Sequence, residues 1–139
     1  VGFEALASRR HGRHFIEVCR NLDQPVQRRL ALMLGGIPRQ TPEARITDIM
    51  QTISPFCRFV GIEIERPELP EIDFAHRTVP IIVLSADGLA DGQAAPGREL
   101  SRLTALLRVF GTHLLVRRVA SADAAAELRH SGVDLFSWA

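Results

Sequence analysis

The run Val79-Pro80-Ile81-Ile82-Val83-Leu84 is apolar throughout and rich in β-branched side chains. Such side chains pack well on the pleated surface of a sheet. A strand that lacks alternating polar residues is typical of a parallel sheet whose two faces are both covered. Pro80 has no amide to donate, so it fits best at the start of the strand. The run therefore predicts a strand near the middle of a parallel sheet.

Upstream of this run, the segments 1–7, 30–35 and 58–65 also predict strands. Between the first two segments, apolar residues recur at helical spacing: Phe15, Ile16, Cys19 and Leu22. The hydroxyl of Thr41 and the proline after it predict the start of another helix, because a hydroxyl caps free amides and proline suits the first turn. The buried stripe expected on that helix consists of Ile46, Ile49, Met50 and Ile53.

Downstream, a loop is expected over 87–97, followed by a helix whose apolar stripe is Leu100, Leu103, Leu107 and Phe110. Strands are predicted over 112–119 and 133–138, and Ser121 is expected to cap the helix between them. The segment 68–77 is interpreted as a short helix or an irregular crossover. Strand and helix signals alternate along the chain, which predicts an α/β fold with a mostly parallel sheet of about six strands and outer helices.

The length of 139 residues and the 46% hydrophobic composition fit one domain over 1–139. Because the chain begins at Val1 inside an expected strand, we expect it to be a segment of a longer protein. The formal charge of +1 gives no field to gather nucleic acid, so no nucleic-acid partner is expected. No apolar run is long enough for a membrane span, and a cytoplasmic location is expected. Cys19 and Cys57 are interpreted as core thiols.

The segment Gly2-Phe3-Glu4-Ala5-Leu6 resembles the opening signature of EAL domains, the bacterial cyclic-di-GMP phosphodiesterase module. Residues 113–119, 121–132 and 133–134 resemble the closing strand, helix and Gly-Cys-Asp segment of that family, in the same order. The family fold is a modified (β/α) barrel of roughly 250 residues with its active site at the carboxyl ends of the strands. The resemblance therefore implies a shortened, incomplete barrel of EAL type.

The resemblance leaves Glu4 and Glu63 as vestigial metal-ligand positions. The asparagine ligand of the family has no match in 30–37, and the paired aspartates are reduced at best to Asp73. The catalytic lysine is also missing, since the sequence contains no lysine. Metal-assisted phosphodiester hydrolysis requires carboxylates that hold two cations. The resemblance therefore implies a degenerate domain that is not an enzyme and holds no metal or cofactor.

Arg117 and Arg118 fall where the family has a glutamate-containing strand end. Alternation along a strand directs one of them inward, and a buried charge is costly unless it is paired. The favoured interpretation is an internal salt bridge to Glu63, Glu65 or Asp87. The alternative left open is an anion-binding site at Arg117 and Arg118.

These observations favour a catalytically inactive, EAL-like regulatory or scaffolding module of bacterial cyclic-di-GMP-related signalling that acts through protein contacts. The alternative is a receptor for a cyclic dinucleotide or another phosphate ligand, with cyclic-di-GMP binding expected to be weak or absent. A sheet of about six strands cannot close a barrel of eight, so open edges are expected to favour a homodimer or a partner domain. Phe136 and Trp138 are interpreted as one core residue and one contact residue.

Overall fold

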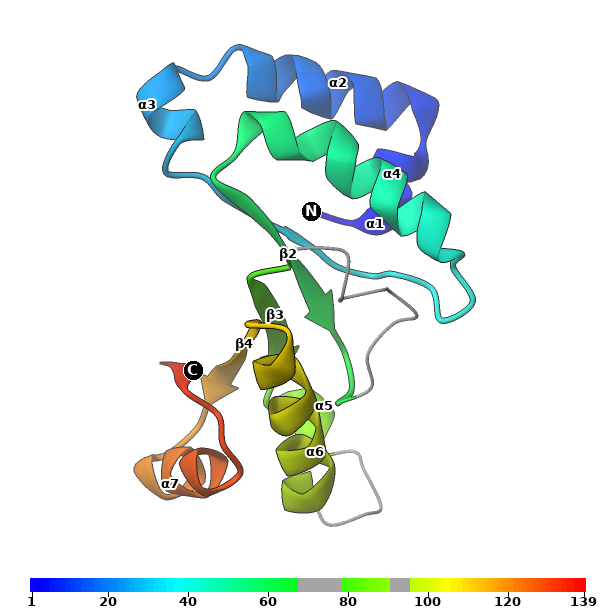
Figure 1. Cartoon of the computed structure of the whole chain (residues 1–139). Coiled ribbons are helices and arrows are strands. Elements are labelled where there is room, and N and C mark those ends of the chain that lie inside the picture. Colours follow the sequence, from blue (N-terminus) through cyan, green and yellow to red (C-terminus); the bar gives the residue numbers. More distant parts are fainter. Residues whose placement is uncertain (68–78, 91–95) are drawn as a thin grey trace.

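The computed structural model describes residues 1–67, 79–90 and 96–139 of an α/β fold (Figure 1). A five-stranded, all-parallel sheet has the order β1-β2-β3-β4-β5. The strands are β1 (Ala31–Leu34), β2 (Phe59–Ile64), β3 (Ile81–Ser85), β4 (His113–Val119) and β5 (Leu135–Trp138). The helices are α1 (Phe3–Ala7), α2 (Arg9–Arg20), α3 (Gln24–Gln27), α4 (Glu43–Ile53), the 3₁₀ turn η1 (Ser54–Phe56), α5 (Asp87–Ala90), α6 (Pro96–Val109) and α7 (Ala122–His130). The predicted alternation of strands and helices is confirmed.

The strand predicted from the β-branched run is the central one, as expected. Ile82, Val83 and Leu84 of β3 are at most 1% exposed. β3 pairs with β2 on one side and with β4 on the other. The continuous apolar run thus marks the place in the sheet where neighbouring strands shield both edges.

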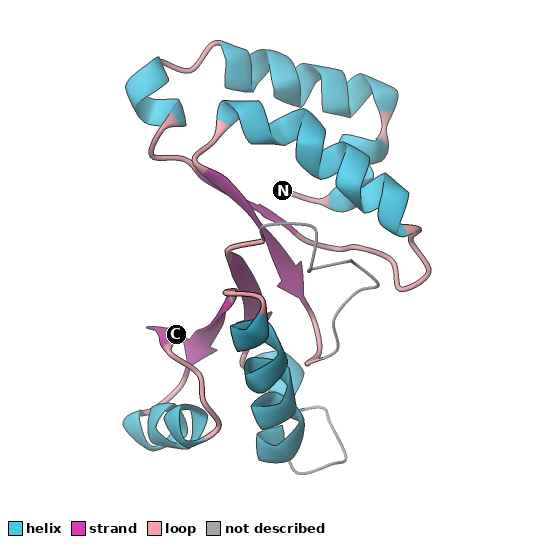
Figure 2. Ribbon diagram, in the orientation of Figure 1, coloured by secondary structure: helices cyan, strands magenta, loops and turns pink. Residues whose placement is uncertain are grey.

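The two faces of the sheet differ in composition, because alternate residues of each parallel strand point to opposite sides. One face, called here the core face, carries the strand residues that pack against the helices: Leu34, Ile62, Ile64, Ile82, Leu84, Leu114 and Val116. The opposite side, called here the second face, carries Met33, Gly61, Glu63, Ile81, Val83, Leu115 and Arg117. Figure 2 shows the helices in two groups, α1 to α4 near β1 and β2, and α5 to α7 near β3 to β5. The core therefore lies between these helices and the core face.

The segment 1–7 is not a strand, which corrects the sequence prediction. Gly2 forms only an isolated parallel bridge with Gly35, and the backbone then turns into α1. Glutamate, alanine and leucine favour helix, and Phe3 anchors the helix by burying its ring to 4% exposure. The described residues therefore contain five strands instead of about six. They form an open sheet with β1 and β5 at its edges.

The predicted stripe of α4 is confirmed at Ile46, Ile49 and Ile53, which are buried, whereas Met50 is only partly buried. The predicted cap is wrong: Pro42 occupies the N-cap position and no side chain caps the helix. The expected loop 87–97 begins with the short helix α5, while the predicted crossover 68–77 lies outside the described residues. Ser121 caps α7 as predicted, because its hydroxyl accepts a hydrogen bond from the Ala124 amide at 3.1 Å.

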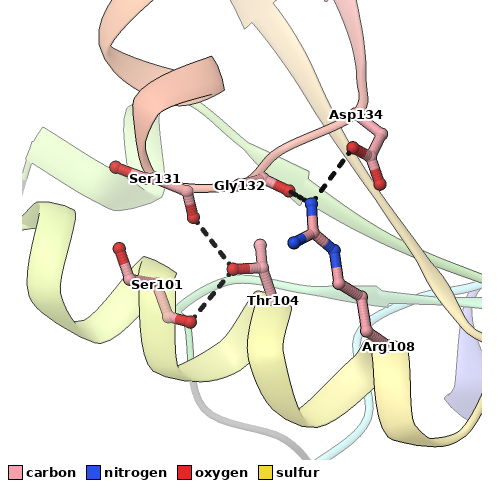
Figure 3. A network of polar contacts seen from close by, with 6 residues as sticks. All are labelled: Ser101, Thr104, Arg108, Ser131, Gly132 and Asp134. Carbon is pink, nitrogen blue, oxygen red and sulfur yellow. Dashed lines mark hydrogen bonds and ion pairs between the residues drawn. The ribbon is translucent and has the colours of Figure 1, made fainter.

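A polar network fixes α6 to the turn between α7 and β5 (Figure 3). The Thr104 hydroxyl lies 2.9 Å from the Ser131 carbonyl and 3.0 Å from the Ser101 carbonyl, so one proton is shared between two acceptors. Arg108 donates to the Gly132 carbonyl at 3.1 Å and to Asp134 at 3.3 Å. Gly132 has φ +89° and, if given a Cβ, would place it 2.9 Å from the Thr104 hydroxyl. These hydrogen bonds from α6 to the turn fix the point at which β5 enters the sheet.

Candidate functional site

The second face carries an ion pair close to the carboxyl ends of the strands, where parallel α/β sheets usually bind ligands. Arg117 of β4 donates from Nη2 to Oε1 of Glu63 on β2. The pair spans β3, because Glu63 is in register with Val83 and Arg117 with Ser85. The two side chains are 43% and 32% exposed, so the pair is only partly shielded from water.

The other carboxylate oxygen of Glu63 packs closely against β1. A Cβ added at Gly35 would lie 2.9 Å from Oε2 of Glu63, which is too close for a real side chain. Gly35 therefore makes room for the carboxylate, and Glu63 is held between the end of β1 and the guanidinium of Arg117.

Arg118 points away from this pair because the strand is irregular there. The register of β4 shifts between Val116 and Val119, and Arg118 has φ +61°, a left-handed conformation that is unfavourable for a residue with a side chain. Its guanidinium lies 3.0 Å from Asp87, which also accepts a hydrogen bond from Ser85 at 3.2 Å. Arg117 and Arg118 thus each pair with a carboxylate that the sequence analysis named, Glu63 and Asp87 respectively.

One donor of the site is left over. Nε of Arg117 is buried and has no hydrogen-bond partner among the described residues. A buried donor without an acceptor is destabilising by an amount comparable to a lost hydrogen bond. The Nε–H group of Arg117 is therefore available to donate a hydrogen bond to a bound acceptor.

Glu4 does not lie at the end of a strand, where the resemblance would place a metal ligand. It is an exposed residue in the first turn of α1. The second vestigial position, Glu63, already pairs with Arg117. The site around Glu63 therefore does not fit a divalent cation. Within residues 1–67, 79–90 and 96–139, no group of three or more acidic, histidine or cysteine side chains is arranged to hold a metal ion. Asp73 lies outside these ranges.

The two aromatic residues near the end of the chain differ in burial. Phe136 packs against the core, whereas Trp138 is 57% exposed. Their rings meet edge to face with centroids 5.5 Å apart, and the Arg129 guanidinium lies 4.8 Å from the centre of the Phe136 ring. Leu135 is 40% exposed. The strand β5, last in the strand order of the described sheet, therefore presents apolar surface.

The sequence interpretation missed a pocket at the opposite, amino end of the sheet. Its volume is about 270 Å³, and it is lined by Gln24, Gln27, Arg28, Pro55, Cys57 and Arg58. The lining comes from two segments about 30 residues apart, and no periodic pattern in the sequence links them. Only the local excess of arginine over 20–29 could have drawn attention to one side of it.

No family model matches the chain, and no curated protein matches it either. The likeness to EAL domains therefore stands on the quoted residues. Among the described residues, no helix combines the length and the apolar character that a bilayer crossing requires.

Proposed function

We propose that this chain is a catalytically inactive, EAL-like regulatory or scaffolding module of cytoplasmic cyclic-di-GMP-related signalling, which acts through contacts with a second copy or a partner domain. The observation that carries the proposal is the ion pair between Glu63 and Arg117. A carboxylate that neutralises an arginine is a poor ligand for a dication, because the guanidinium repels the metal and competes for the same oxygens.

The edge strand β5 supports the second half of the proposal. An exposed strand edge with apolar side chains is a template for pairing with another chain. Leu135 and Trp138 provide that apolar surface here. A two-fold contact between copies is the simplest form, since closed dimers are the commonest assemblies.

Hydrolysis of cyclic-di-GMP in the presence of magnesium or manganese tests the loss of activity. We expect turnover no higher than that of a blank without protein. Metal-dependent turnover well above that control would overturn the proposal. Light scattering tests the association: we expect mass to rise with concentration, and replacement of Trp138 by Ser to reduce the rise.

A receptor function is the second candidate, and the unpaired Nε of Arg117 favours it. A phosphate oxygen is the acceptor that guanidinium groups bind best, and such contacts weaken with salt. Calorimetry with cyclic-di-GMP separates the candidates. Salt-sensitive binding that disappears in an Arg117→Gln variant would favour the receptor, whereas no heat at any salt concentration would favour the interaction module.

A further inference from the structure

The pocket at the amino ends of β1 and β2 is built by two elements that approach each other from different parts of the chain. The short helix α3 supplies Gln24, Gln27 and Arg28, and the segment from η1 into β2 supplies Pro55, Cys57 and Arg58. Figure 1 shows α3 beside the end of α4, from which η1 and β2 continue. The pocket is therefore a feature of the folded chain and not of one local segment.

The frame of the pocket is fixed by hydrogen bonds. Nε2 of Gln27 donates to the Cys19 carbonyl at 2.9 Å and to the Leu22 carbonyl at 3.1 Å, which ties α3 to the end of α2. The Arg58 amide donates to the Leu30 carbonyl at 2.8 Å, which ties the start of β2 to the start of β1. Arg28 and Arg58 consequently extend from anchored backbone.

The charge of the pocket is positive. Two guanidinium side chains line it, and the described lining contains no carboxylate. Guanidinium groups offer several donors in a planar fork that matches the oxygens of phosphate.

We infer that this pocket binds a small tetrahedral oxyanion, such as inorganic phosphate or the phosphate group of a small metabolite, through Arg28 and Arg58. The volume of about 270 Å³ is slightly below the roughly 300 to 1,000 Å³ of sites for drug-sized ligands. It therefore suits a small anion and is too small to enclose a cyclic dinucleotide. The inference is independent of the proposed function, whose residues lie at the carboxyl end of the sheet.

Cys57 provides a reporter for this site, because it lines the pocket and is only half-buried, while Cys19 is 3% exposed. The rate at which a small alkylating reagent modifies Cys57 in the full chain is measured with increasing inorganic phosphate. Sodium chloride at matched ionic strength is the blank, and sulfate and acetate are parallel arms. Protection by phosphate is expected to saturate, and unreacted Cys19 serves as the internal reference.

The variants are Arg28→Gln, Arg58→Gln and the double variant, with Arg102→Gln on the exposed side of α6 as the matched control. Each pocket substitution is expected to weaken phosphate binding about tenfold, since a charge-assisted hydrogen bond is lost. The control should bind like the unchanged chain. The thermal unfolding midpoint, measured with and without phosphate, gives a second readout that does not depend on the thiol.

Protection by phosphate and sulfate, lost in the double variant and accompanied by a phosphate-dependent rise in the unfolding midpoint, supports the inference. Equal protection by chloride, or undiminished protection in the double variant, overturns it. If acetate protects Cys57 from alkylation as well as phosphate does, the inference that the pocket selects tetrahedral oxyanions is overturned. No protection together with no shift of the midpoint overturns the site itself.

Discussion

The two faces of the sheet are made by alternate residues of the same strands, yet they differ in what the side chains do. The core face is a continuous apolar surface that packs against buried side chains of helices α1, α4, α6 and α7. The second face mixes apolar side chains with Gly61 and with the ion pair between Glu63 and Arg117. A continuous apolar run such as 79–84 therefore identifies a central strand without showing that helices cover both of its sides.

The largest expected effect separates the two faces directly. Ile62→Ala on the core face removes a side chain that is 0% exposed, and it should lower the free energy of unfolding by about 4 kcal/mol. Leu115→Ala on the second face should cost about 2 kcal/mol, because Leu115 is only partly buried. Urea denaturation measures both values. Equal losses would break the distinction, since they would mean that the second face is packed as tightly as the core face.

A second test adds volume to the second face instead of removing it. A Cβ at Gly61 would lie 2.6 Å from the sulfur of Met33 and 2.9 Å from the carbonyl oxygen of Ile81. Gly61→Ala should therefore lower the free energy of unfolding by about 2 kcal/mol through overpacking. Gly2→Ala is the matched control, because nothing lies within 4 Å of its added Cβ. A neutral Gly61→Ala variant would contradict close packing between β1, β2 and β3.

The ion pair of the second face should contribute less. Both side chains are about a third or more exposed, so solvent screens their attraction, and Glu63→Gln should lower the free energy of unfolding by roughly 1 kcal/mol. A double-mutant cycle with Arg117→Gln isolates the coupling between the two residues. A coupling energy of zero would mean that the ion pair does not stabilise the second face. The position of the Glu63 side chain would then be set by its packing against Gly35 alone.

The smallest effect concerns alkaline pH at the entrance to β2. Burial raises the pKa of the Cys57 thiol above the model-peptide value of 9.0, with the nearby Cys19 adding to the rise, while backbone amides of Leu32 and Phe59 oppose it. A raised folded-state pKa gives stability that is fully present below pH 9.0 and is lost as pH increases through the folded-state pKa, because the unfolded chain releases the proton more easily.

Thermal unfolding of the unchanged chain and of Cys57→Ser, below and above pH 9.0, measures this effect. The unchanged chain should lose more stability above that pH than the variant does. Identical pH profiles would show that the thiol is solvated in the folded state.

The strands and most helices could be predicted because their signals are local. The run 79–84, the stripe of α4 and the serine cap of α7 each depend on residues close together in the sequence. The segment 1–7 was mispredicted because only Gly2 pairs like a strand residue, with Gly35, while the chain after it forms a helix that buries the Phe3 ring in the core. That outcome depends on tertiary packing, which local patterns do not contain.

The candidate site was predictable only in part. Alternation and charge placed one arginine inward and named Glu63, Glu65 or Asp87 as its partner. In the structure Arg117 pairs with Glu63, and the exposed Arg118 pairs with Asp87. The bulge that gives Arg118 a positive φ was not predictable, because it results from the shifted register between β4 and β5. The pocket of Arg28 and Arg58 was missed for a similar reason, since it forms only when α3 meets the start of β2.

The order of the strands also bears on how the chain forms its sheet during synthesis. Each strand pairs with the one made just before it, so no strand has to insert between two that are already joined. On the ribosome, β1 and β2 with α4 can assemble while β4 and β5 are still being translated. We expect protease resistance to appear first in the segment up to β2 and to extend strand by strand toward β5, with the Trp138 edge always the last to form.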